Sequence, residues 1–309
     1  MRIGIVGAGG IGCLLGARLA ATGQAKVLLL ARGEHAARLA EQGLVLDFNG
    51  VRETHCLPVI DTANEAALGQ LAGCDWLLFA CKSQHTRRLA EQLKPYVSAD
   101  CRLGSLQNGV DNEPILAEVF ERPVMGGLMR KFFAHITAPG EVEVRGVLEA
   151  VLGDYPTGCG RETTAMVELL RQAGITVYAS EDIRRELWRK LVLNNGCNPL
   201  AAVTFLDTQR MANDPDMAWV MRNLMREAGA AAAADEVEFS PHELEAVFQW
   251  IKGIDPITPS MQADAQRGKP LELDGITGAI LRRAGLLGIE VPVTATLHHI
   301  LLGKYGSSD

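Results

Sequence analysis

The sequence predicts an α/β fold in two parts: an N-terminal domain of alternating strands and helices, then a C-terminal domain of helices alone. Three observations support this prediction. An apolar strand runs into a glycine-rich turn within the first twelve residues, strand and helix patterns alternate as far as residue 180, and apolar residues then recur at helical spacing. We therefore expect one domain at 1–180 and a second at 181–309.

The first strand is followed by G-x-G-x-x-G at Gly7, Gly9 and Gly12. Gly7 permits the tight turn, Gly9 lets the backbone approach a pyrophosphate, and Gly12 allows the next helix to pack on the sheet. The pattern alone is weak, because glycine-rich turns also form for structural reasons. Here a helical segment and a second apolar strand, Lys26–Ala31, complete a βαβ unit, which predicts a Rossmann dinucleotide-binding domain.

The turn and the end of the second strand indicate which dinucleotide binds. Helix N–H groups of the turn can hold phosphate. The expected cofactor contacts there are Gly7, Ala8, Gly9, Gly10, Ile11 and Gly12. An acidic residue after the second strand holds the NAD ribose, whereas a cation accommodates the 2′-phosphate of NADP. Arg32 stands at this position and favours NADP, although Glu34 is close by and the arginine could simply be solvated.

Further strands are expected through the first half of the chain. After a small hairpin insertion at 43–48, they lie at 76–80, 102–106, 124–128, 140–144, 150–153 and 176–180. One open sheet should therefore continue to about residue 180. Beyond it, the alanine-rich stretch 228–234 indicates close helix packing. Two-domain dinucleotide enzymes generally hold substrate in the cleft between the domains.

Composition excludes several classes of partner. The chain has 309 residues, 48% hydrophobic and 22% charged, and its formal net charge of −7 argues against nucleic acid. Seven cysteines without a C-x-x-C pair fit a reducing compartment and suggest no metal site. No run of 18 uncharged apolar residues suggests a membrane span. We expect a cytoplasmic protein that binds a small molecule, and a homodimer stays open.

Polar residues follow two of the predicted strands. Lys82 comes after 76–80, and Asn108 comes after 102–106. Ligands bind at the carboxyl ends of such strands, so both residues are candidate contacts. The alternatives are a solvated loop cation at Lys82 and a simple turn at Asn108.

In the helical half, Lys190, Asn194 and Asn198 recur every four residues and so share one helix face. Asparagine is a poor residue inside a helix, because its amide competes for backbone hydrogen bonds. Two asparagines beside a lysine therefore indicate hydrogen bonding to a ligand or to neighbouring backbone.

Across nearly its whole length the chain resembles the ketopantoate reductases (2-dehydropantoate 2-reductases). Several separated motifs occur in the right order. The matching segments are Gly7, Gly9 and Gly12 with Arg32, Lys82-Ser83, Leu106–Val110, Ala134 with Pro139-Gly140, Trp188–Leu191, Asn194, Asn198–Leu200, Pro259–Asp264 and Leu271–Gly275. The resemblance implies NADPH-dependent reduction of a 2-oxo acid to a 2-hydroxy acid, in the first place 2-dehydropantoate to (R)-pantoate in pantothenate biosynthesis.

The resemblance also implies roles for single residues. Lys190 would be the catalytic lysine, Glu272 would orient the lysine or the cofactor, and Asn108 would hold nicotinamide or substrate. The further contacts it implies are Lys82, Ala134, Asn108 and Glu272 for the cofactor, and Asn108, Lys190, Asn194, Asn198 and Ser260 for the substrate. The chemistry agrees, because hydride addition to a carbonyl carbon leaves negative charge on oxygen, where a positioned acid is needed.

Three positions depart from the family pattern. Thr208 stands where the family has a substrate asparagine, Thr277 where it has the asparagine of Asn-Gly, and His85 where it often has Gln or Asp. Two alternatives therefore stay open. One is a related reductase or dehydrogenase for another branched 2-oxo or 2-hydroxy acid, and the other is a non-catalytic NADP-binding sensor. Retention of Lys190, Asn108 and Glu272 together argues against the sensor.

Overall fold

The computed structural model describes residues 1–306, so the last three residues of the expected 181–309 domain lie outside the described part. The chain forms two compact units. The sheet unit comprises Met1–Gln107 and Asn112–Glu186, and the helical unit comprises Asn108–Asp111 and the residues from Leu187 onward. The units thus divide after Glu186, whereas the sequence suggests residue 180. Ile183 explains the difference, because its side chain packs against Gly126 and Gly153 of the sheet.

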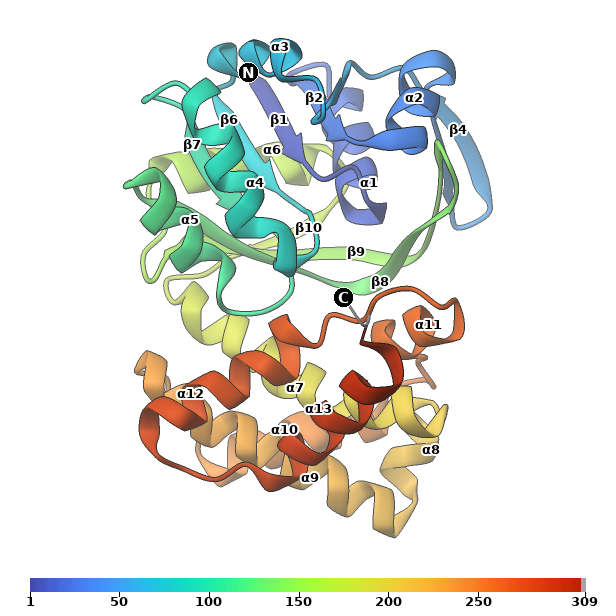
Figure 1. The fold of residues 1–309 in the computed structure, drawn as a ribbon, viewed down its shortest axis with the longest axis vertical. Coiled ribbons are helices and arrows are strands. Elements are labelled where there is room, and N and C mark those ends of the chain that lie inside the picture. Colours follow the sequence, from blue (N-terminus) through green and yellow to red (C-terminus); the bar gives the residue numbers. More distant parts are fainter. Residues whose placement is uncertain (307–309) are drawn as a thin grey trace. The chain divides into compact units, whose positions relative to one another are not determined.

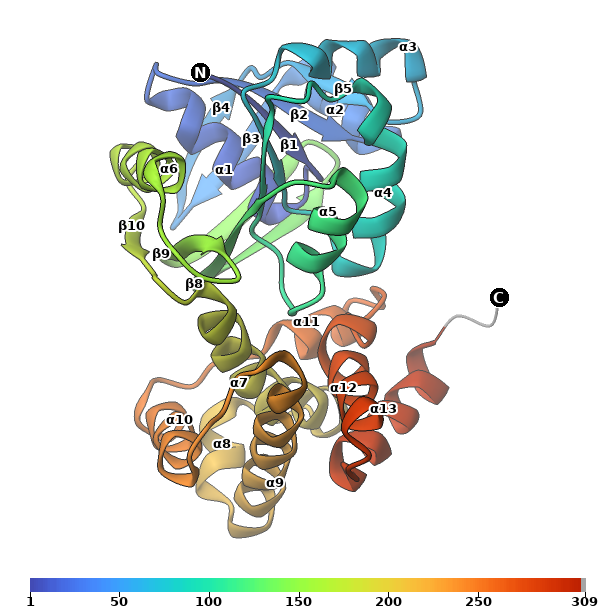
Figure 2. The same ribbon diagram turned by 90° about the vertical axis from the view of Figure 1, so that its left-hand side faces the viewer.

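The sheet unit contains one mixed sheet (Figures 1 and 2). Its strands are β1 (Arg2–Val6), β2 (Lys26–Ala31), β3 (Leu44–Phe48), β4 (Val51–His55), β5 (Val59–Asp61), β6 (Trp76–Phe79), β7 (Arg102–Ser105), β8 (Val124–Ala138), β9 (Glu141–Tyr155) and β10 (Thr176–Ala179). Within the described residues they run in the order β4-β3-β9-β8-β7-β6-β1-β2-β5, with β10 beside β9. The run from β5 to β8 is parallel, and β8 pairs with β9 antiparallel. The predicted open sheet is confirmed.

Helices cover both faces of this sheet, which explains why its central strands are apolar throughout. The helices of the unit are α1 (Gly10–Ala21), α2 (Gly33–Gln42), α3 (Glu65–Leu68), α4 (Thr86–Leu93), α5 (Asn112–Phe120) and α6 (Arg161–Gln172). In β6, Trp76 and Leu78 belong to the core shared with α1 and α6, whereas Leu77 and Phe79 belong to the core shared with α4 and α5.

Three strand predictions need correction. The segments expected at 140–144 and 150–153 are the two ends of one strand, β9, and the strand expected at 124–128 continues to Ala138 as its partner β8. The segment 43–48, expected as a small hairpin insertion, is strand β3, which forms a hairpin with β4 at 51–55 and is part of the sheet because it also pairs with β9. Strand β5 is not among the predicted strands, because its three residues are too few to show the alternation of apolar and polar residues that indicates a strand.

The helical unit, apart from Asn108–Asp111, consists of helices and their connections in the described residues. They are α7 (Ile183–Thr204), whose first residues belong to the sheet unit, α8 (Thr208–Asn213), α9 (Pro215–Ala231), α10 (Pro241–Gly253), α11 (Ser260–Gln266), the π-helical turn η5 (Asp274–Gly278), α12 (Ala279–Leu287) and α13 (Pro292–Tyr305). Ala228, Ala231 and Ala232 are buried, in accord with the packing role predicted for the alanine-rich stretch. None of the helices described is long and apolar enough to cross a membrane.

Candidate functional site

The glycine-rich turn has the geometry that its sequence predicts. Gly7 has a φ of +102°, which favours glycine, and a Cβ there would lie 2.7 Å from the Cα of Cys81. A Cβ on Gly12 would overlap the carbonyl oxygen of Gly7 and touch Ile5. Both glycines therefore let helix α1 start immediately beside strand β1.

The other two glycines of the turn differ in what surrounds them. A Cβ on Gly10 would overlap the backbone of Ala134 in β8, so the turn rests directly on that strand. A Cβ on Gly9 would meet no atom of the described residues within 4 Å. Gly9 is followed by Gly10, Ile11 and Gly12 in the first turn of α1, where backbone N–H groups lack partners inside the helix. An open face lined by such donors fits a pyrophosphate.

His35 of α2 supports this turn, and sequence reasoning missed it. Its Nε2 lies 2.8 Å from the carbonyl oxygen of Ala8, and its Nδ1 accepts a hydrogen bond of 3.0 Å from the N–H of Gly140. The ring is therefore a neutral imidazole that donates through Nε2. Burial holds the pKa of His35 below its usual value of 6.5, although the Ala8 carbonyl works in the opposite direction. No local sequence pattern indicates this role, because the contact joins His35 to Gly140, 105 residues further along the chain.

The two cations predicted for the cofactor lie at strand ends. Arg32 directly follows β2 and is exposed at the start of α2, and Lys82 precedes the short helical turn Ser83–His85 after β6. Burial first, and then the positive charges of Arg32, Arg88 and Lys82, hold the pKa of His85 below 6.5. These side chains form one positive region at the strand ends, which fits an anionic ligand.

Helix α7 carries Lys190, Asn194 and Asn198, which confirms that they share one helix face. Lys190 and Asn194 are half-buried, whereas Asn198 is only 3% exposed. The adjacent Asn195 has a structural role, because its amide donates to the carbonyl of Leu224 and to the hydroxyl of Thr294. Asn195 lies outside the four-residue spacing, and ligand binding by Asn194 and Asn198 stays a prediction.

The helical unit also joins Asn108 to Glu272. Asn108 Nδ2 donates to Glu272 Oε2 at 3.2 Å, across 164 residues of sequence. Gly109, with a φ of +95°, lies so close to Gly275 that a Cβ would be 2.9 Å from its carbonyl oxygen. The loop that follows β7 therefore packs on the segment that carries Glu272, and two of the three predicted catalytic residues are in contact.

Two of the positions that depart from the family pattern are buried and hydrogen bonded. Thr208 is 5% exposed, its hydroxyl accepts from the N–H of Ile257 at 3.1 Å, and its own N–H donates to the Ile257 carbonyl at 3.0 Å. It thereby anchors the segment that leads to Ser260, the exposed first residue of α11. The hydroxyl oxygen of Thr277, in η5, lies 2.7 Å from His298 Nδ1. No group of three possible metal-ligating side chains occurs in residues 1–306.

Comparison with protein families matches both halves of the chain. Residues 3–157 match the family described as ketopantoate reductase PanE/ApbA, and residues 182–304 match the C-terminal part of the same family. The chain is 30% identical to the 2-dehydropantoate 2-reductase of Archaeoglobus fulgidus over 306 residues, which covers 98% of this chain and 97% of that enzyme.

Solved structures agree with this match. The crystal structure of a PanE/ApbA family ketopantoate reductase from Ralstonia eutropha JMP134 has a TM-score of 0.86 and 30% identity, and the alignment covers 97% of each chain. A ternary structure of D-mandelate dehydrogenase with NADH and anilino(oxo)acetate has a TM-score of 0.87 at 23% identity and covers 99% of this chain and 98% of that one. At that identity the second likeness shows the fold alone.

Proposed function

Because the chain belongs to the ketopantoate reductase family, we propose that it is an oxidoreductase that uses NADPH to reduce 2-dehydropantoate to (R)-pantoate. One observation carries the proposal for the site itself. Asn108 and Glu272, distant in sequence, are hydrogen bonded in the same unit whose helix α7 carries Lys190. A polar set of this composition suits a carbonyl reduction, which needs a proton donor and hydrogen bonds to orient the reactants.

The cofactor would be held by the sheet unit. The open face at Gly9 and the N–H groups of Gly10, Ile11 and Gly12 would bind the pyrophosphate, with Ala8 and Ala134 shaping the turn. Arg32 and Lys82 would pair with the 2′-phosphate and the neighbouring ribose. When bound, NADPH supplies the hydride.

Lys190 would act as the general acid. Negative charge develops on the carbonyl oxygen as hydride adds to carbon, and an ammonium group placed there stabilises the charge and donates a proton. Glu272 would orient the lysine or the cofactor, and Asn108, fixed by Glu272, would hold the nicotinamide or the substrate. Asn194, Ser260 and the buried Asn198 would serve the substrate carboxylate and hydroxyl.

The free thiols support a cytoplasmic location for this reaction. None of the seven cysteines forms a disulfide in the described residues, and burial raises the pKa of Cys13, Cys101 and Cys197 to about 12. Thiols persist in reducing compartments.

NADPH oxidation followed against a panel of 2-oxo acids tests the proposal. The sharpest pair is 2-dehydropantoate and trimethylpyruvate, which differ only in the substrate hydroxyl. We expect kcat/KM to be at least tenfold higher for 2-dehydropantoate, which corresponds to about one hydrogen bond. A higher kcat/KM for another branched 2-oxo acid would identify a related reductase instead. NADPH binding without turnover of any 2-oxo acid would identify a sensor.

A further inference from the structure

Asp111, three residues after Asn108, is held by two adjacent arginines of helix α12. Arg283 Nη1 donates to Asp111 Oδ1 at 2.6 Å, and Arg282 Nη2 donates to Oδ2 at 2.7 Å. The arginines differ in environment, because the Arg283 side chain is 9% exposed and that of Arg282 is 46% exposed. A buried guanidinium needs ionised partners, so the contacts of Arg283 are the ones that the fold requires.

Arg283 has a second carboxylate partner on the other side. Its Nε donates to Asp235 Oδ2 at 2.7 Å, and the indole N–H of Trp188 donates to the same oxygen at 3.0 Å. The guanidinium carbon lies 5.4 Å from the centroid of the fully buried Trp188 ring. Burial lowers the pKa of Arg283, but Asp111 and Asp235 outweigh this effect and raise it, so the charge persists.

These contacts join the segments that carry the proposed catalytic residues. Trp188 lies on α7 two residues before Lys190, and Asp111 closes the loop that begins at Asn108. The same loop packs on the segment of Glu272 through Asn108 and Gly109. We call Asp111, Arg283, Asp235 and Trp188 the Arg283 network.

We propose that Arg283 is a positioning residue, which fixes the Asn108–Asp111 loop to helix α7 so that Asn108 and Lys190 keep one arrangement. This proposal rests on the proposed function. Displacement of a reacting group by about 1 Å can reduce a rate by about 100-fold, so an anchor that touches no reactant still affects kcat.

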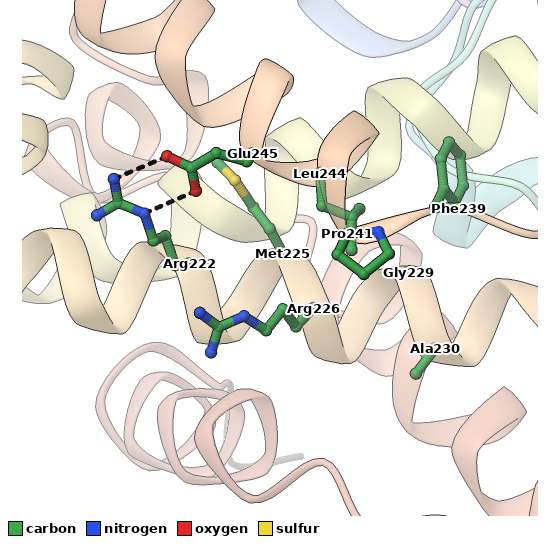
Figure 3. A pocket seen from close by; sticks show the side chains of 9 residues that line it. All are labelled: Arg222, Met225, Arg226, Gly229, Ala230, Phe239, Pro241, Leu244 and Glu245. Carbon is green, nitrogen blue, oxygen red and sulfur yellow. Dashed lines mark hydrogen bonds and ion pairs between the residues drawn. The ribbon is translucent and has the colours of Figure 1, made fainter.

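Two variants have in common that they break the contact between Arg283 and Asp111. Arg283→Lys keeps the charge, but a single ammonium lacks the planar fork that reaches both carboxylates. Asp111→Asn removes the charge of the loop. Because the Asp111 side chain is 24% exposed, against 9% for Arg283, this second variant is expected to fold even if Arg283→Lys does not. The matched control is Arg222→Lys. Arg222 makes two hydrogen bonds of 2.9 Å to Glu245 (Figure 3). Its guanidinium carbon lies 3.7 Å from the Phe248 ring centroid, and the helices α9 and α10 that carry these residues hold no proposed site residue.

Three measurements test the proposal: steady-state turnover of saturating 2-dehydropantoate, NADPH binding by fluorescence titration, and amide hydrogen exchange of peptides that cover 108–111. We expect kcat to fall at least about tenfold in Arg283→Lys and Asp111→Asn, with NADPH affinity within about twofold of wild type. The double variant should be no more than about twofold slower than Arg283→Lys, because both changes break the Arg283–Asp111 contact and the further contact of Asp111, with Arg282, is at an exposed side chain. Exchange at 108–111 should accelerate in these variants and stay unchanged in Arg222→Lys.

A kcat in Arg283→Lys within twofold of wild type would overturn the proposal, and so would an equal loss in Arg222→Lys. Unchanged exchange at 108–111 in Arg283→Lys would overturn it as well, whether or not the wild type turns over. A wild type that does not oxidise NADPH with 2-dehydropantoate would instead overturn the proposed function, and the exchange measurement alone would then decide whether Arg283 anchors the loop.

Discussion

The two units build their parts of the candidate site in different ways. In the sheet unit, the expected cofactor turn is contiguous, from Gly7 to Gly12, and close backbone approach to Cys81 and Ala134 shapes it. In the helical unit, the site comes from segments as far apart as Asn108 and Glu272 and depends on side-chain hydrogen bonds. The sheet unit should therefore be sensitive to added atoms, and the helical unit to removed functional groups.

The largest effect is expected from removal of Lys190. Lys190→Ala should lower kcat by at least about 100-fold and leave NADPH affinity nearly unchanged, because the ammonium acts mainly in the transition state. Steady-state kinetics and fluorescence titration measure the two quantities. Arg189→Ala is the control, because Arg189 is the exposed neighbour on the same helix. An unchanged kcat in folded Lys190→Ala protein would assign the acid to another residue.

Addition of one methyl group at Gly9 should mainly affect cofactor binding. Gly9 has φ −76° and ψ −168°, which alanine adopts without strain, and its Cβ would point into open space. Gly9→Ala should therefore keep the wild-type Tm but weaken NADPH binding by at least about tenfold, because the methyl group occupies space needed by the pyrophosphate. Gly69→Ala, also open and with φ −56°, should change neither quantity. Undiminished NADPH binding in Gly9→Ala would place the cofactor elsewhere.

Reversal of the charge at Arg32 should change the choice of cofactor. Arg32→Asp should lose about 10- to 100-fold in NADPH affinity and little in NADH affinity, the range expected for charge-assisted hydrogen bonds to one phosphate. Titration with both cofactors measures the ratio. Arg38→Asp, an exposed change on the same helix, controls for overall charge. If wild-type protein binds both cofactors within twofold, the role assigned to Arg32 is wrong.

The smallest effect concerns pH and His35. The pKa of His35 in the folded protein lies below 6.5, so protonation of His35 favours the unfolded chain. The stability that neutral His35 contributes is therefore lost as the pH falls from 6.5 through the folded pKa. His35→Gln removes this titration, so the Tm of the variant should fall less than that of the wild type over this pH interval. Parallel Tm curves for the two proteins would contradict the account of the Ala8 and Gly140 contacts.

The geometry of the glycine-rich turn could be predicted from sequence because the turn is formed by residues close together in the chain. Gly7, Gly9 and Gly12 each meet the surroundings that their spacing predicts, and Arg32 follows β2 as expected. Strand β9 was harder, because Gly146, at φ +117°, stands within it beside exposed residues and interrupts the apolar pattern. A break in pattern at one glycine therefore does not end a strand when its partner β8 continues to pair across it.

The helical half of the site shows where sequence reasoning ends. Spacing alone places Lys190 and Asn194 on one face of a helix, but it does not show that the neighbouring Asn195 bonds to α9 and α13. The contact of Asp111 with Arg283 spans 172 residues and leaves no local pattern. Such contacts depend on how the helices pack, and no spacing within one segment encodes them.

The most direct test of the division between the two units is a double-variant cycle with Gly9→Ala and Lys190→Ala. The quantity to measure is kcat/KM for NADPH at saturating 2-dehydropantoate in the wild type, both single variants and the double variant. If one unit binds the cofactor and the other provides the proton, the fold-losses of the single variants should multiply in the double variant to within about twofold. A double variant that is more than about tenfold better or worse than this product would contradict independent roles for the two units.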